Sequence, residues 1–109
     1  MTDQSAAGGN GGPVLEVLTG MTMDSLEASN LEPDVLMLVR LAALVAIDAP
    51  AASYLLNLGA AAEVGITLEQ VQGVLTAVAP IAGGPRVVAA VAAIAEALGI
   101  AIDLAQEPA

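Results

Sequence analysis

The feature that most constrains the fold is a series of apolar segments divided by residues that start and end helices. Thr67 and Gln70 form a capping box, in which the threonine accepts a bond from a backbone amide and the glutamine reaches back. Gly65 suits the left-handed position that ends a helix, and Pro85 suits the start of one. Apolar residues recur three and four positions apart, without strand-like alternation. The sequence therefore predicts an all-α fold.

These signals predict a compact bundle of five to six helices. The expected helices cover residues 14–29 (in two short pieces), 33–47, 50–65, 67–79 and 86–98. Ser29 or Asn30 is expected to cap the helix over 33–47, and Asp48 the helix over 50–65, because short polar side chains accept bonds from the first-turn amides. Gly20 is expected to break the first helix, and Pro80 and Gly99 to end the last two.

Two packing stripes follow from the apolar spacing. One is expected on the helix that begins at the capping box, and it consists of Val71, Val74, Leu75 and Val78. The other is expected on the last helix, and it consists of Val87, Val91, Ile94 and Leu98. Most other positions of the last helix are alanine, so that a second helix can approach it closely.

Residues 14–102 are expected to form a single helical domain between two tails. Residues 1–13 are rich in glycine and polar side chains, which predicts a disordered tail, and residues 103–109 are expected to be a second one. The first segment has neither the positive charge nor the apolar core of a secretory signal. A cytoplasmic location is therefore expected.

The chain is too apolar to cover its own surface. Hydrophobic residues make up 57% of its 109 residues, and a domain of this size has little interior volume. Lipid is the weaker explanation, since a spanning helix needs roughly 18 consecutive apolar residues. The longest uncharged run, residues 70–85, contains two prolines and a Gly-Gly pair, and Arg40 and Arg86 interrupt the other apolar stretches. We therefore expect a homo-oligomer rather than a membrane protein.

Charge and missing residue types exclude several functions. Twelve acids against two basic residues give a net charge of −10, which argues against nucleic-acid binding. The chain contains no cysteine and no histidine, which excludes disulfides and thiol redox chemistry. Scattered acids do not form a calcium loop, and no phosphate-binding glycine motif is present. We therefore expect no metal and no cofactor.

Three stretches resemble the carboxymuconolactone decarboxylase and alkylhydroperoxidase D-like family. They are LEPDVLMLVRLAALVAI, AAAEVGITLEQVQGVL and APIAGGPRVVAAVAAI, beginning at residues 31, 60 and 79. The resemblance implies an all-α subunit that assembles into trimers or hexamers, with pockets between subunits. It covers about two-thirds of the chain.

The residues that react in that family are replaced here. The peroxidase branch carries Cys-x-x-Cys-x-x-x-His on a helix, followed by a glycine that aligns with Gly65. The resemblance then places the cysteine positions on Pro50 and Ser53, and the histidine position of both branches on Asn57. The position of the glutamate proton donor falls on or near Leu38. Proline has no thiol, and a serine nucleophile needs a base that this chain does not have.

A candidate ligand pocket can still be assembled, without any catalytic residue. It consists of Arg40, Ser53, Tyr54, Asn57 and Arg86. Ser53 and Asn57 share a helix face, where they are expected to line a small pocket or an interface. Tyr54, the single aromatic residue, is either a core residue or a site residue.

The two arginines allow two interpretations. They form ion pairs with Asp48, Glu63 or Glu32, or they bind a small carboxylate, which is the kind of group on which the decarboxylase branch acts. Arg40 lies on the most apolar helix and is expected to be largely buried with a partner. The leading hypothesis is a non-redox, non-catalytic oligomeric protein with a structural or small-ligand-binding role. The alternatives are a lyase or isomerase acting on a carboxylated lactone-like compound, and an accessory subunit of a larger complex.

Overall fold

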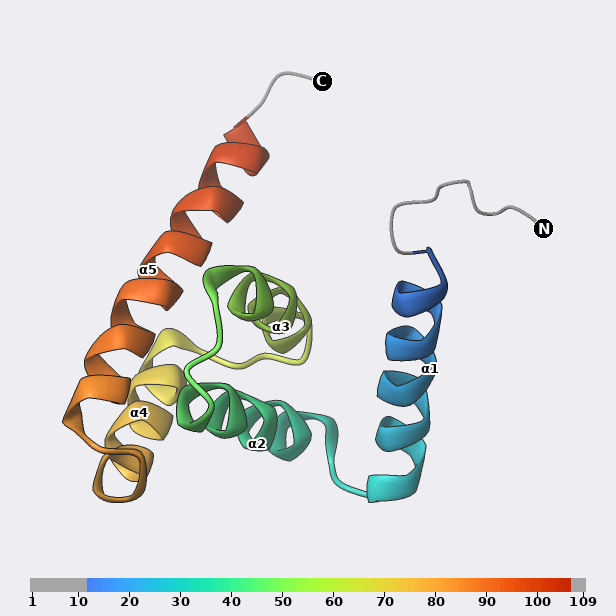
Figure 1. Ribbon diagram of the computed structural model, residues 1–109, viewed down its shortest axis with the longest axis horizontal. Helices are drawn as coiled ribbons and strands as arrows, with labels where there is room; N and C mark the ends of the chain where they lie inside the picture. The colour runs from blue at the N-terminus through green and yellow to red at the C-terminus, as the bar shows by residue number, and fades with distance from the viewer. Residues whose placement is uncertain (1–11, 107–109) are drawn as a thin grey trace. The chain divides into compact units, whose positions relative to one another are not determined.

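The computed structural model describes residues 12–106, and over this range the chain is all-α, with five helices and no strand (Figure 1). The helices are α1 (Gly12–Ser29), α2 (Pro33–Ala46), α3 (Ala51–Glu63), α4 (Leu68–Ala82) and α5 (Gly84–Gln106). The predicted fold class is confirmed. The chain divides after Leu31 into two units, so that α1 belongs to one and α2–α5 to the other.

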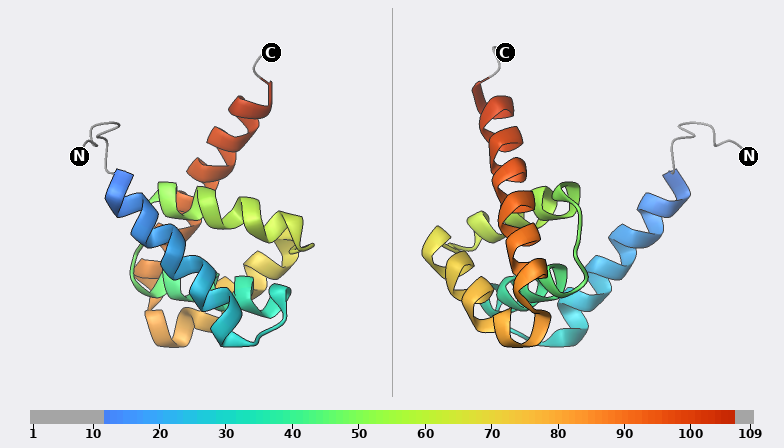
Figure 2. Two further views of the ribbon diagram at one scale, coloured as in Figure 1. Left: turned by 90° about the vertical axis from the view of Figure 1, so that its right-hand side faces the viewer. Right: turned by 60° about the vertical axis from the view of Figure 1, so that its left-hand side comes forward.

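The four helices of the second unit form a closed ring of neighbours. Helix α2 packs against α3 and α4, and α5 packs against the same two helices (Figure 1). The C-terminal part of α5 extends beyond the other three helices (Figure 2). None of the helices in the described range is long and apolar enough to cross a membrane.

Small and branched side chains, together with one tyrosine, fill the centre of this ring. The core cluster consists of Leu41, Val45, Ala49, Tyr54, Val71, Leu75, Ala90, Ile94 and Ala97. On α4 the predicted stripe is correct, since Val71 and Leu75 are buried and Val74 and Val78 pack against the cluster. On α5 the buried face runs through Ala90 and Ala97, whereas Val91 is 52% exposed. The predicted seam on the last helix is thus wrong at Val91, because alanine rather than valine faces the closest neighbours.

Helix α3 ends in a left-handed residue, as predicted. Gly65 has a φ of 87°, its amide donates to the carbonyl of Ala62, and the next amide, of Ile66, donates to Ala61. These two bonds define a Schellman motif, which satisfies carbonyls that the end of a helix leaves without partners. Ile66 is half-buried against the core and completes the motif.

The same motif ends α2 at Asp48, which was expected to cap α3 instead. Asp48 has a φ of 59°, its amide donates to Val45, and the amide of Ala49 donates to Leu44. Aspartate tolerates the left-handed region better than most residues with a side chain. Helix α3 has Pro50 at its N-cap and no side-chain cap.

Asn30, which was expected as a possible cap of α2, instead follows the end of α1 with a φ of 56°. The hydroxyl of Ser29 accepts from the amide of Leu31 and donates to the carbonyl of Leu26. Both residues therefore finish α1, whereas the N-cap of α2 is Glu32, without a side-chain bond. The polar residues were recognised correctly, but they end the preceding helix instead of starting the next one.

The capping box of α4 is present as predicted. The hydroxyl of Thr67 accepts from the amide of Gln70 at 3.1 Å, and the Gln70 side chain accepts from the amide of Thr67 at 2.9 Å. Three expected helix breaks are wrong: Gly20, Pro80 and Gly99 all lie inside helices. The glycines cost only about 1 kcal/mol relative to alanine. Helix α4 continues for only two residues beyond Pro80.

Only part of the two predicted tails lies within the described residues. Residues 103–106, assigned to a C-terminal tail, belong to α5. Residues 1–11 of the predicted N-terminal tail and residues 107–109 of the C-terminal one lie outside the described residues.

Candidate functional site

Ser53 and Asn57, which the resemblance places at reactive positions, lie one turn apart on α3. The side-chain amide of Asn57 donates from Nδ2 to the backbone carbonyl of Ser53 at 2.9 Å, and both residues are half-buried. This bond is local to the helix. It uses an amide donor that would otherwise be available to a ligand, and neither group can exchange a proton near neutral pH.

Tyr54, adjacent in sequence to Ser53, points into the core. It is fully buried, it belongs to the same cluster as Val45 and Ala97, and its hydroxyl has no hydrogen-bond partner within the part of the chain that the structure describes. Burial, and secondarily the negative charge of Asp48, raises the pKa of the phenol above its ordinary value of 10.0. The side chain therefore stays neutral at physiological pH and is unsuited to act as a base.

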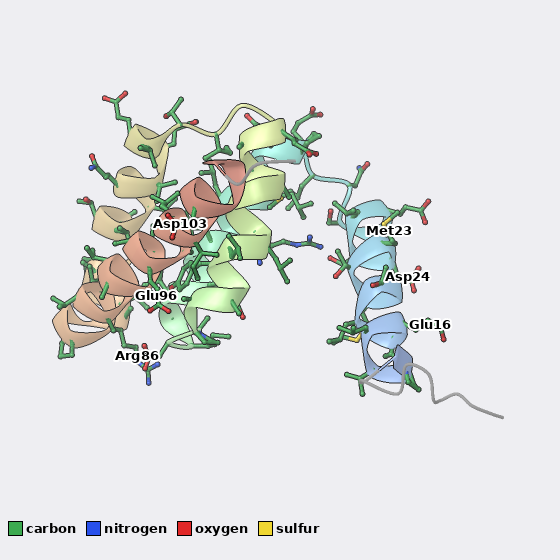
Figure 3. The ribbon with its side chains drawn as sticks, turned by 90° about the horizontal axis from the view of Figure 1, so that it is seen from above. Glu16, Met23, Asp24, Arg86, Glu96 and Asp103 are labelled. Carbon is green, nitrogen blue, oxygen red and sulfur yellow. The ribbon has the colours of Figure 1, made fainter. Side chains whose placement is uncertain are left out.

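Arg86 stabilises the end of another helix. It lies in the first turn of α5, and its Nη1 donates to the carbonyl of Ala46, the last residue of α2, at 2.9 Å (Figure 3). A cation is favourable at a helix C-terminus, where carbonyls lack partners. The two interpretations of this residue were an ion pair with an acid and a site for a small carboxylate; the bond that the structure gives it is to the backbone. The guanidinium itself is exposed.

Arg40 is half-buried in the middle of α2, not largely buried as expected. Leu36 and Met37, which share its helix face, are buried, whereas Val35 and Val39, on another side of α2, are 42% and 52% exposed. Arg40 is nevertheless not free, because it makes an interaction within the chain. A cation of this kind is partly hydrated, so that it does not require a fully compensating buried acid.

The candidate pocket is therefore divided among several places in the bundle. Ser53 and Asn57 lie together, Tyr54 is enclosed in the core, and Arg86 is bonded to the end of α2. Two hollows of the second unit lie elsewhere, between α4 and α5. None of the five predicted residues lines them.

The hollows between α4 and α5 were not predicted from sequence. One, of about 420 Å³, is lined by Gln72, Leu75, Thr76, Ala79, Val87 and Val91. The other, of about 270 Å³, is lined by Leu68, Val71, Gln72, Leu75, Val91, Ile94, Ala95 and Leu98. Because the two share Gln72, Leu75 and Val91, we treat them as one feature, the α4–α5 groove. The sequence feature that could have indicated this groove is Val91, an apolar residue of the last helix that is not part of the core.

Over the described residues, the fold is an all-α helical bundle. Residues 12–97 match the family model of the Carboxymuconolactone decarboxylase family, and the chain belongs to this family. No curated protein shows significant similarity to the chain. No solved structure does so either.

Proposed function

We propose that this protein is a non-redox member of the carboxymuconolactone decarboxylase family, which acts as an oligomeric structural or small-ligand-binding subunit. The proposal rests on the residue types found at the positions that the resemblance assigns to the reactive side chains. Pro50 and Ser53 stand where the resemblance places thiols, and Asn57 stands where it places the proton-transferring histidine. Asn57 is bonded to the carbonyl of Ser53, which gives it a role in the helix.

Oligomerisation is supported by the apolar side chains that the chain leaves uncovered. In the second unit, Leu56, Ile81 and Val88 are 77%, 88% and 69% exposed. In the first, no residue of α1 is buried. In proteins most of the stability of a helix comes from packing of an apolar face rather than from intrinsic propensity. Further copies of the chain would provide that packing.

The redox half of the proposal is tested by hydroperoxide turnover. Purified protein supplied with a dithiol reductant and an organic hydroperoxide is expected to show no consumption above that of a heat-inactivated sample. The reason is that peroxide attack requires a thiolate, and the chain has no cysteine. Turnover that co-purifies with the folded protein would contradict the proposal.

A small carboxylate ligand is the second candidate function, and it is favoured by the exposure of Arg86. The guanidinium is held by the carbonyl of Ala46 and can present its planar edge to a carboxylate. A thermal-shift series with small mono- and dicarboxylates on the natural protein and on Arg86→Met would test it. Ligand binding predicts an increase in melting temperature that the variant loses. No increase in either protein would favour the purely structural role.

A further inference from the structure

We draw no further inference here: the strongest candidate, the apolar α4–α5 groove around Gln72, Leu75 and Val91, carries none, because nothing in the structure shows what covers it.

Discussion

The orphan hydroxyl of Tyr54 leads to an unusual expectation, namely that its removal stabilises the protein. Tyr54 is fully buried, and its hydroxyl has no partner among the described residues. A buried polar group without a hydrogen bond costs about 1–3 kcal/mol relative to its hydrated state. Phenylalanine keeps the ring and leaves no large cavity. Tyr54→Phe should therefore raise the free energy of unfolding by about 1 kcal/mol, or the melting temperature by roughly 4–8 °C.

The pH dependence of the same side chain provides an independent check. The pKa of Tyr54 is raised in the folded state, by burial first and by Asp48 second, above the ordinary value of 10.0. The folded protein therefore holds the phenolic proton more tightly than the unfolded chain does. The stabilisation from this effect is fully present below the unfolded pKa, and it is lost as pH rises from about 10 through the folded value. Tyr54→Phe should lack this part of the alkaline loss.

Both quantities can be measured cleanly, because the chain has one tyrosine, no tryptophan and no phenylalanine. Tyrosinate absorbance during alkaline titration reports Tyr54 alone, and urea unfolding followed by far-ultraviolet circular dichroism at fixed concentration gives the stability difference. Val45→Ala, in the same core, serves as the control for packing loss and should be destabilising. A Tyr54→Phe variant that loses stability, or a native pKa at or below 10.0, would refute the reasoning by showing that the hydroxyl has a partner.

Three further predictions concern helix ends and glycines. Gly99→Ala and Gly65→Ala should change the stability of the protein in opposite directions, measured by thermal unfolding. Gly99→Ala, inside α5, should stabilise it by up to about 1 kcal/mol, whereas Gly65→Ala should destabilise it because Gly65 has a φ of 87°. Thr67→Ala should cost about 1 kcal/mol in urea unfolding through loss of the N-cap of α4, and an unchanged midpoint would contradict the capping box. Arg86→Met should lower stability by a few tenths of a kcal/mol to about 1 kcal/mol without added carboxylate, because it removes the bond to the carbonyl of Ala46, and stability equal to the natural protein would show that this bond contributes nothing.

Sequence patterns located the helices well but placed several boundaries wrongly. The capping box at Thr67 and the left-handed Gly65 were predictable, since each depends on local backbone chemistry that a few neighbouring residues determine. Asp48 was assigned to the wrong helix because an acidic residue between two helices can finish one or start the next. Only the path of the chain decides between them. Gly99 was predicted as a helix end, but α5 continues through it, because a glycine inside a helix costs only about 1 kcal/mol relative to alanine.

The candidate site was predictable only in part. The adjacency of Ser53 and Asn57 follows from helical spacing, and the structure places them so. The bond from Arg86 to α2 joins residues 40 positions apart, and nothing in the local sequence indicates it. The α4–α5 groove depends on which face of α5 meets the core. Ala90 and Ala97 occupy the buried face of α5 and Val91 is exposed, because the neighbouring helices approach that face closely.

The mass of the assembled protein tests the central claim most directly. A member of this family without cysteine or histidine, and with exposed apolar side chains in both units, is expected to function as an oligomer. Light scattering on the purified natural protein at micromolar concentration should give a single species at a multiple of 10.7 kDa. A monodisperse species at 10.7 kDa would contradict the account.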